Sequence, residues 1–311
     1  MKRILVISLI ALALLYALRE LEYAGIRRSQ QGEFAKLREM FLEPQHYDVL
    51  VVGSSRAEAH FNTAVIDSAT GLCSYNAGLL GATSPFMKTA LEAYLENSKA
   101  PQYVILNIDY HAPGDSPDTI HDFPRYFPYL ANEKLYAGLC KHDKRFPYFR
   151  YLPFYSMPYC GTRFLNSAIR GYAGKTGVYD SLTYHGYLPV IRKIIIDPDT
   201  FRFPVYRKMP PEATMQGYAG IISLCKKNNI KVIIVLSPLY KQFSKWLTNE
   251  AEVVSFLHDF AAKQDVPLFN YSRSPLCDDK SLFADPAHLN REGSTRFSRI
   301  FAKDLAQYLR Q

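Results

Sequence analysis

Short runs rich in apolar residues alternate along the chain with longer segments of helical character. The run at 49–52 is uninterrupted, the run at 103–108 is nearly all apolar, and shorter or mixed runs cover residues 72–75, 231–236 and 266–270. They lack the polar alternation of a half-exposed strand, so they are typical of strands buried on both faces of a parallel sheet. Helices are expected over residues 63–68, 84–97, 211–228, 248–264 and 292–309. The pattern predicts an α/β fold with a doubly wound, mostly parallel five-stranded sheet flanked by helices.

The alternation breaks between about residues 110 and 210, where Pro, Tyr and Phe are frequent and no period is sustained. Because a loop of this length without structure is uncommon in a compact domain, we interpret residues 112–210 as an aromatic-rich insertion that covers the carboxyl edge of the sheet. Its tyrosines suit a cleft for sugar rings, which offer apolar faces to aromatic rings and hydroxyl rims to hydrogen bonds. The alternative is that these aromatic side chains pack only a small core of the insertion itself.

The chain begins with a targeting segment. Lys2 and Arg3 precede residues 4–18, which are mostly apolar and carry no charge. This length suits a secretory signal as well as a short membrane helix, but no small-x-small cleavage site follows. We expect an uncleaved signal-anchor, with Lys2 and Arg3 in the cytoplasm and the bulk of the chain on the periplasmic or extracytoplasmic side. The alternative is a buried helix of a soluble protein, which another element would have to cover.

The expected domain organisation follows from these segments. Residues 1–20 form the transmembrane anchor. Phe34, Leu37, Met40 and Phe41 recur at helical spacing before Pro44, so residues 21–45 are predicted to form a connector helix. Residues 46–311 form the α/β domain, interrupted by the insertion at 112–210.

Charge and cysteine content narrow the range of partners. The formal net charge is +8, but Lys and Arg are scattered and no nucleic-acid-binding motif is present, so no nucleic-acid partner is expected. The basic excess suits an acidic envelope or membrane surface. None of the five cysteines has C-x-x-C spacing, so we expect neither a metal nor another cofactor. Cys73 and Cys225 lie in apolar contexts typical of core residues, whereas Cys140 and Cys160 are able to pair in an oxidising compartment.

Candidate chemistry starts where the first apolar run ends. Gly53 allows the backbone to turn, and Ser54 and Ser55 follow at the carboxyl end of the strand, where open α/β sheets bind their ligands. Ser55 is therefore a candidate nucleophile. The alternative is an ordinary strand-to-helix turn with a serine N-cap.

The candidate base lies near the other end of the chain, where Asp285 and His288 are three residues apart on a loop before the last helix. This spacing allows the carboxylate to accept a hydrogen bond from Nδ1–H, which leaves Nε2 free to take a proton from a serine hydroxyl. The alternatives are a surface or helix-capping imidazole and an Asx turn before Pro286. Together with Ser55, the pair predicts a Ser-His-Asp triad.

Attack by a serine also requires donors for the developing oxyanion. Backbone N–H groups of Ser55 and Gly78 are candidates, and Asn76 or Asn107 offers a side-chain amide. Asn107 is the weaker candidate. Strand alternation places Asn107 and Asp109 on one face and Ile108 on the other, and it does not show which of these faces meets the cleft. Asp109, Tyr110 and His111 are expected to line the cleft.

In this order, these residues resemble the SGNH hydrolase superfamily, also called GDSL-like. Gly53-Ser54-Ser55 resembles the first block with Ser in place of the usual Asp, Asn76 to Gly81 resembles the second with Gly78 as the oxyanion glycine, and Asp285-Pro286-Ala287-His288 resembles the closing D-x-x-H block. The third block, usually Gly-x-Asn-Asp, departs here to Leu106-Asn107-Ile108-Asp109. The resemblance covers about residues 46–111 and 212–311 and implies a flavodoxin-like fold.

The Gly-Ser-Ser variant, the anchor and the closing His-Leu-Asn-Arg-Glu-Gly are similar to envelope members of the superfamily, such as the D-alanyl transfer protein of teichoic acids and the alginate acetylation proteins. This resemblance implies a membrane-anchored serine O-acyltransferase or esterase, in which Ser55 takes an acyl group and delivers it to a sugar hydroxyl or to water. It implies an acylated glycan or acyl donor as substrate and a membrane-bound O-acyltransferase as partner. The alternative, favoured by the altered third block, is a non-catalytic glycan-binding or scaffold subunit of an envelope polysaccharide modification complex.

Overall fold

The computed structural model describes residues 1–30, 32–110, 120–175, 183–191, 197, 199, 200, 202 and 204–310. The chain divides into two compact units, which are described separately. Unit 1 contains Met1–Pro44, Glu92–Asn97 and Asp122–Ser181, and unit 2 contains Gln45–Leu91, Ser98–His121 and Leu182–Gln311.

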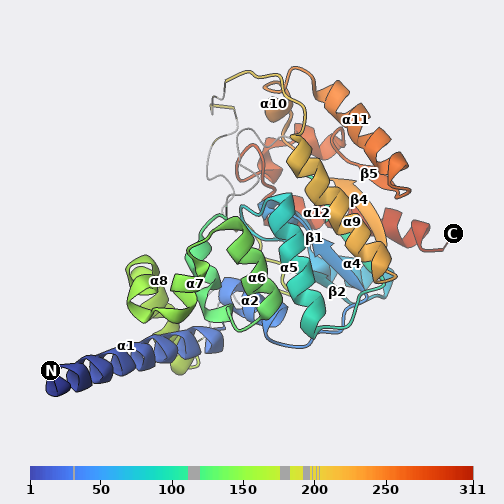
Figure 1. The fold of residues 1–311 in the computed structure, drawn as a ribbon. Helices are drawn as coiled ribbons and strands as arrows, with labels where there is room; N and C mark the ends of the chain where they lie inside the picture. Colours follow the sequence, from blue (N-terminus) through green and yellow to red (C-terminus); the bar gives the residue numbers. More distant parts are fainter. Residues whose placement is uncertain are drawn as a thin grey trace. The chain divides into compact units, whose positions relative to one another are not determined.

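Unit 2 is built on a five-stranded sheet in which every strand pair is parallel (Figure 1). The strands are β1 (Val49–Val52), β2 (Ser74–Asn76), β3 (Tyr103–Asn107), β4 (Lys231–Leu236) and β5 (Leu268–Asn270). Their order across the sheet is β2-β1-β3-β4-β5. The predicted five-stranded α/β fold is confirmed, and the sheet is wholly parallel instead of mostly parallel.

Helices cover both faces of this sheet, which explains the runs rich in apolar residues. The helices of unit 2 are α3 (Ser55–His60), α4 (Thr63–Thr70), α5 (Ser84–Asn97, of which Glu92–Asn97 belongs to unit 1), α9 (Glu212–Lys227), α10 (Lys241–Ser244), α11 (Glu250–Lys263) and α12 (Arg291–Tyr308), with short 3-10 helices at Pro275–Asp278 and Lys280–Leu282. Val49 and Val51 share one core with Phe297 and Phe301 of α12, while Leu50 and Val52 on the opposite face are buried too. Helix α9 lies over the other face, in front of the strands in Figure 1.

The strand order places a crevice at the carboxyl ends of β1 and β3. From β1 the chain crosses to β2 on one side, and from β3 it crosses to β4 on the other. Open α/β sheets bind ligands at such a switch point, because the connections leave the sheet in opposite directions and open a gap. The segments after β1 and β3 are therefore placed to supply functional side chains.

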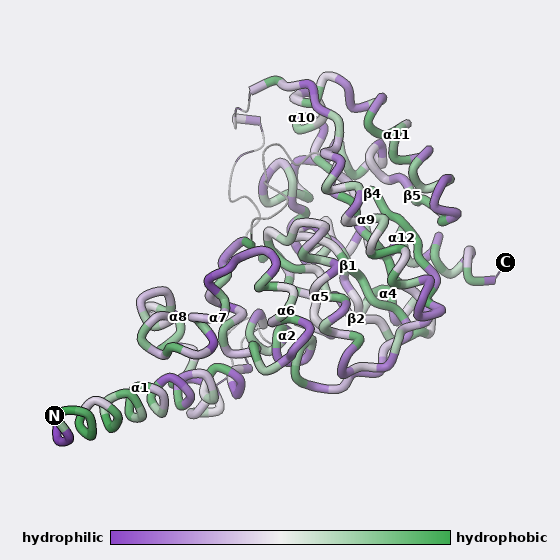
Figure 2. Tube along the Cα trace, viewed as in Figure 1, coloured by the Kyte–Doolittle hydropathy of each residue, from purple (hydrophilic) through white to green (hydrophobic). Residues whose placement is uncertain are grey.

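Unit 1 is helical in the part that the structure describes. It contains α1 (Lys2–Arg28), α2 (Gly32–Phe41), the 3-10 helix η1 (Phe123–Tyr129), α6 (Glu133–His142), α7 (Phe146–Tyr151) and α8 (Pro153–Tyr172). The boundary predicted at residue 20 falls inside α1, so anchor and connector are not separated there. Helix α1 is long and apolar enough to cross a membrane, and its first half is hydrophobic all round (Figure 2). A signal sequence has the same properties.

The predicted insertion at 112–210 is divided between the two units. Within unit 1, Phe123, Phe127, Phe146 and Phe149 pack on one another, with the rings of Phe127 and Phe149 only 4.6 Å apart. These rings form a small core of their own, which was the alternative to a sugar-binding cleft. All five cysteines are free, so Cys140 and Cys160 are not paired.

Candidate active site

Ser54 and Ser55, the two serines of the turn after β1, make different contacts. A side chain on Gly53 would bring its Cβ within 2.6 Å of the Ala57 Cβ, so only glycine allows α3 to begin so close to the strand. Ser54 is the N-cap of α3, and its hydroxyl accepts the Arg56 N–H at 3.3 Å. Ser55 is the first residue of the helix, and its side chain takes no part in the cap. The N-cap interpretation thus applies to Ser54 and leaves Ser55 available.

The structure brings together Ser55, His288 and Asp285. The Ser55 Oγ lies 2.8 Å from Nε2 of His288, and Nδ1 of the same ring lies 2.9 Å from both carboxylate oxygens of Asp285. The two ring nitrogens therefore face opposite partners. This is the geometry in which an imidazole accepts a proton from one side while a carboxylate holds its N–H on the other.

Asp285 also organises the backbone of its own loop. Its Oδ1 accepts the N–H groups of Ala287 and His288 at 2.8 and 2.9 Å. Burial disfavours the charge of this carboxylate, but the hydrogen bonds and the charge of His288 outweigh that effect, so the pKa of Asp285 lies below its ordinary value. An ionised Asp285 keeps the proton of His288 on Nδ1, and Nε2 is then the acceptor for the Ser55 hydroxyl.

A second histidine, His60, contacts the backbone of the loop that carries Asp285 and His288. Its Nε2 accepts the N–H of Leu289 at 3.0 Å, so its proton lies on Nδ1 and is donated to the Ser237 Oγ, 3.1 Å away. Burial, with the nearby charges of Arg56 and His288, holds the pKa of His60 well below its ordinary value. No sequence motif points to His60, because it is an isolated histidine on a short helix.

Arg56 is a buried cation next to Ser55 in the chain. No sequence motif points to this residue. Its guanidinium lies 3.2 Å from Oδ1 of Asp109 and 3.0 Å from the Ser237 Oγ, and it donates to the Ser237 carbonyl at 2.5 Å. The Asp109 backbone N–H donates to the hydroxyl of Tyr218 at 3.3 Å. Arg56 and Asp109 therefore connect the segments that follow β1, β3 and β4.

Ser55 and His288 line a cleft of about 210 Å³. The rest of the described wall is largely apolar and includes the cations Arg56 and Lys208. The described residues of this wall include Ala82, Tyr110, Tyr206, Met209, Pro210, Pro211, Tyr218, Leu239, Phe243 and Leu247. Asp109 and Tyr110 line the cleft as predicted, and His111 lies outside the described residues. Tyr206 is the tyrosine of the predicted insertion that reaches this wall in the part of the chain that the structure describes.

Asn76, Gly78 and Asn107, which the sequence predicts as oxyanion donors, are not among the described residues that line the cleft. The Asn76 amide donates to the carbonyls of Ala57 and Phe61 at 2.8 and 2.9 Å and therefore secures the end of α3. Its Oδ1 accepts the Gly78 N–H at 3.0 Å, so that donor is already engaged. Asn107 is fully buried, and its amide lies 3.4 Å from Oδ1 of Asp109.

Gly81, three residues beyond Gly78, does line the cleft. Its φ is +66°, in the region that favours glycine, and an added Cβ would come within 2.5 Å of the Cβ of His121. The signal for this residue was present in the sequence, where Gly78 and Gly81 both follow Asn76 within one loop. The sequence alone does not distinguish which glycine meets the cleft, because that depends on the path of the loop.

The solved structures that are similar to this chain include the following three. A proposed acylhydrolase from Bacteroides fragilis has 13% identity and a TM-score of 0.42 over 89% of this chain and 95% of its own. A proposed lipolytic protein of the G-D-S-L family from Desulfitobacterium hafniense has 10% identity and a TM-score of 0.43 over 83% and 99%. A GDSL-like lipase from Bacteroides thetaiotaomicron has 13% identity and a TM-score of 0.41 over 84% and 88%.

Two of these names refer to the G-D-S-L family and the third to an acylhydrolase. No family model and no curated protein matches the chain. Identities of 10–13% are too low to transfer an activity, so the chemistry is assigned from the side chains of this chain.

Proposed function

We propose that this protein is a serine acyl-transfer enzyme, an esterase or O-acyltransferase that acts on acyl esters of a cell-envelope polysaccharide. The observation that carries the proposal is the continuous chain of contacts from the Ser55 Oγ through both nitrogens of His288 to Asp285, at 2.8 and 2.9 Å. Ser55, at one end of this series of contacts, lines a cleft with a largely apolar wall, which suits an acyl group.

Each proton in the proposed reaction has an acceptor. The Ser55 Oγ attacks the acyl carbonyl carbon while its proton moves to Nε2 of His288. Collapse of the tetrahedral intermediate breaks the ester bond, and the departing alkoxide takes the proton back from Nε2, which leaves an acyl ester on Ser55. A sugar hydroxyl or water then attacks this ester and gives its proton to His288, and Ser55 is regenerated. Asp285 holds the ring throughout and stabilises the imidazolium.

The developing oxyanion requires backbone donors in this arrangement. The Ser55 N–H lies in the first turn of α3, where backbone N–H groups have no acceptor within the helix. Gly81 supplies the second position in the proposal, because its main chain lines the cleft without a side chain in the way. A hole built from the main chain replaces the asparagine that the sequence motif led us to expect.

Substrate and location follow from other parts of the chain. Tyr110, Tyr206 and Tyr218 line the cleft and suit the apolar face and hydroxyl rim of a sugar. Helix α1 anchors the protein in the proposal, with Lys2 and Arg3 on the cytoplasmic side and the cleft on the extracytoplasmic side. A membrane-bound O-acyltransferase is the proposed partner that supplies the acyl group.

A second candidate function is a glycan-binding or scaffold subunit without turnover. It is favoured by one observation, that no side-chain amide is among the described residues lining the cleft. Treatment with a serine-directed phosphonate distinguishes the two, because a covalent adduct forms only on an activated serine. Mass spectrometry should locate one adduct on Ser55, and the Ser55→Ala variant should remain unlabelled. An unlabelled wild-type protein, together with no release of acetate from a small acetyl ester, would favour the scaffold.

A further inference from the structure

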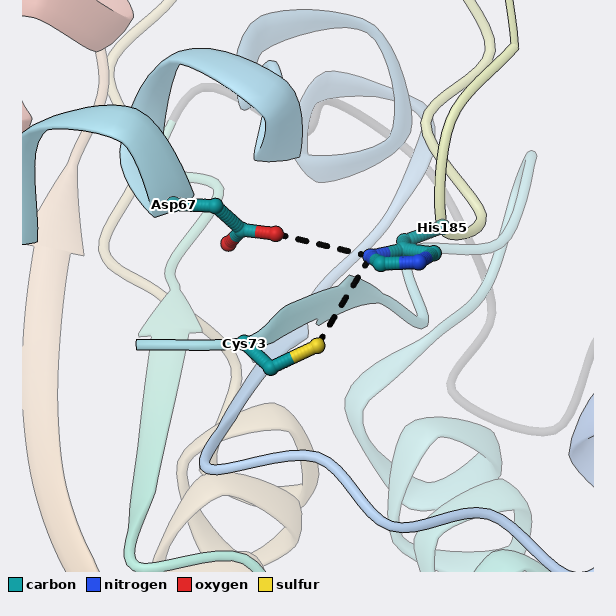
Figure 3. A group of neighbouring side chains, drawn as sticks. All are labelled: Asp67, Cys73 and His185. Carbon is teal, nitrogen blue, oxygen red and sulfur yellow. Dashed lines mark hydrogen bonds and ion pairs between the residues drawn. The ribbon is translucent and has the colours of Figure 1, made fainter. Parts of the chain in front are cut away.

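Asp67, Cys73 and His185 form a separate cluster in unit 2, and none of them lines the cleft of Ser55. One ligand atom from each, a carboxylate oxygen, a thiol sulfur and a ring nitrogen, lies within 4.8 Å of the other two. Figure 3 shows the carboxylate and the sulfur pointing toward the same nitrogen of the His185 ring. The Asp67 Oδ2 is 3.4 Å and the Cys73 Sγ 4.0 Å from Nδ1.

This convergence on one nitrogen distinguishes the cluster from a catalytic relay. A relay needs the acid on one ring nitrogen and the nucleophile on the other, so that the imidazole passes a proton between them. Here a single proton on Nδ1 can be donated to only one of the two neighbours. A cation between the three atoms would satisfy all of them at once.

The separations suit a small tetrahedral metal ion. Bond lengths of about 2.0–2.3 Å from zinc to nitrogen, oxygen and sulfur imply ligand-to-ligand distances of about 3.4–3.6 Å. The observed 3.4 Å between His185 and Asp67 meets this value, and the 4.0 Å between His185 and Cys73 is within a small side-chain movement of it. A mixed thiolate, imidazole and carboxylate set favours zinc or a similar divalent transition metal over magnesium or calcium.

Each ligand is already held in place by groups that a metal would not displace. The Asp67 Oδ1 accepts the N–H of Ser74 at 2.7 Å as well as its hydroxyl, which leaves Oδ2 free to face His185. The Cys73 N–H donates to Asp48 at 3.0 Å, and the His185 carbonyl accepts the Asn76 N–H at 2.8 Å. Outer contacts of this kind orient the ligands of metal sites in proteins.

We propose that Asp67, Cys73 and His185 bind one zinc-class divalent cation, with water in the fourth position. The side chains of His185 and Asp67 are 30% and 16% exposed, so solvent reaches the site. The bound ion joins α4 and Cys73, the residue before β2, to the Tyr184–Tyr187 bridge, and His185 in that bridge is 112 residues from Cys73 in the chain. The proposal does not depend on the reaction at Ser55.

Cobalt titration of the purified full-length chain in detergent, after treatment with a chelator, tests this site. We expect one Co²⁺ per chain, a near-ultraviolet thiolate-to-cobalt absorption band, and displacement of Co²⁺ by Zn²⁺. Cys73→Ser should abolish the band, and Asp67→Asn and His185→Gln should each weaken binding by about 10-fold or more. Cys140→Ser, which alters another half-buried free cysteine, is the matched control and should keep the band.

Two results would overturn the metal site. One is a band of equal strength in Cys73→Ser, and the other is an unchanged cobalt affinity in all three cluster variants. Either would leave Asp67 and His185 as an ion pair with an uninvolved thiol. Circular dichroism of each variant separates loss of the site from loss of the fold, and the conservative Asp67→Asn change retains the result if Cys73→Ser fails to fold.

A different observation in unit 1 concerns α8, which is apolar on two faces. One face, including Phe164, Ala168 and Gly171, is buried, and Gly171 approaches Gly25 of α1 so closely that an added Cβ would lie 1.9 Å from the Gly25 carbonyl oxygen. Gly161 has non-helical φ and ψ and divides α8 into two segments. In the second segment, the other face exposes Leu165, Ile169 and Tyr172, each to more than two fifths of its area.

The position of α8 along α1 indicates what covers this second face. The Tyr172 hydroxyl donates to the Leu21 carbonyl at 2.8 Å, and Tyr23 donates to the Ser156 hydroxyl at 3.2 Å. Residues 4–18 of α1 carry no charge and are exposed except for the half-buried Leu15, and the buried Arg19 and half-buried Glu20 follow before Leu21. The contact at Leu21 places the end of α8 about one helical turn beyond this apolar segment, and an exposed apolar face at that position suits a membrane surface.

We infer that the exposed face of α8 lies in the interfacial layer of the membrane that α1 enters, which rests on the proposed anchoring of α1. Arg170 and Lys175, both exposed, supply charges for anionic headgroups. A tryptophan introduced by Leu165→Trp reports on this in vesicles with brominated lipids, because bromine quenches only fluorophores in the acyl region. We expect loss of its fluorescence, whereas Ile300→Trp on the exposed surface of α12 and the buried natural Trp246 should be unaffected.

Flotation of the same vesicles distinguishes failure of the proposed α1 anchor from failure of the proposed α8 placement. A chain that floats with the lipid and leaves a tryptophan at 165 unquenched contradicts the placement of α8 alone. A chain that does not float contradicts both the anchor and the placement of α8.

Discussion

His288 and His185 both lie in unit 2 beside a carboxylate and a side chain that is nucleophilic when ionised. His288 uses its two ring nitrogens for different partners, Asp285 on Nδ1 and Ser55 on Nε2. His185 directs a single nitrogen toward both Asp67 and Cys73. Residue types are alike in the two clusters, so the chemistry depends on which atoms face one another. We propose that the first arrangement moves a proton and that the second surrounds a position for a cation.

The largest expected effect is on kcat, and it distinguishes a substitution of Ser55 from a substitution of Cys73. Ser55→Ala should lower kcat for hydrolysis of a small acetyl ester by about 10⁴-fold or more, because no other group forms the acyl ester. Cys73→Ala should leave kcat unchanged. Turnover of a chromogenic acetate by both variants measures this, and a Ser55→Ala enzyme with wild-type kcat would remove the basis of the proposed function.

The two carboxylates provide the next comparison. Asp285→Asn should lower kcat by about 10³-fold, since an amide does not hold the proton of His288 on Nδ1. Asp67→Asn is the matched change in the other cluster and should alter cobalt binding but not kcat. Equal effects of the two substitutions on ester turnover would mean that the clusters do not have the separate roles proposed here.

Two glycines test the proposed oxyanion loop. Gly81→Ala should lower kcat by about 10-fold or more, because both its φ of +66° and contact with His121 force the loop to move away from its place beside the cleft. Gly71→Ala is the control: its φ is +73°, but an added Cβ meets nothing within 4 Å. Both variants should lose about 1 kcal/mol of unfolding free energy from the backbone strain, and only Gly81→Ala should lose activity.

The smallest effect concerns the support that His60 gives to the His288 loop. The pKa of His60 is held well below its ordinary value of about 6.5 in the folded protein, so only the unfolded chain takes up this proton as the pH falls below that value. Its contribution to stability is therefore complete above about pH 6.5 and is lost as the pH falls toward the lowered folded pKa.

The loss from one such group is at most about 1.4 kcal/mol per pH unit. Urea unfolding at pH 7.5, 6.5 and 5.5 should show a smaller decline for His60→Gln than for the wild type. Equal slopes would mean that His60 is protonated in the fold.

Much of the catalytic edge was predictable because it depends on local pattern and on topology. The apolar runs at 49–52 and 231–236 reappear as β1 and β4 with the same bounds, since strands buried on both faces are rich in apolar residues. Parallel strands then bring all their carboxyl ends to one edge. Ser55 and His288 lie 233 residues apart in the chain, yet any fold of this class places the segments that carry them near one another.

Which residues of the loop from Asn76 to Gly81 line the cleft was not predictable in the same way. Asn76, Gly78 and Gly81 lie within six consecutive residues, and their roles depend on the direction of each side chain and on the path of the loop. In the fold, Asn76 turns toward the open carbonyls at the end of α3, where a buried amide finds three acceptors. Only Gly81 remains at the cleft. The resemblance to a known motif pointed to this loop and named Gly78, whereas Gly81 is the glycine of the loop that lines the cleft.

The sequence by itself determined the sheet, the turn after β1 and the Asp285 to His288 loop, because each rests on contacts between chain neighbours or on a repeated pattern. Tertiary structure alone decided the rest. Cys73 and His185 are 112 residues apart and share no motif, and Gly25 meets Gly171 only through the packing of α1 on α8. A contact between distant segments requires no particular spacing in the chain, so the fold is the first level at which it can be seen.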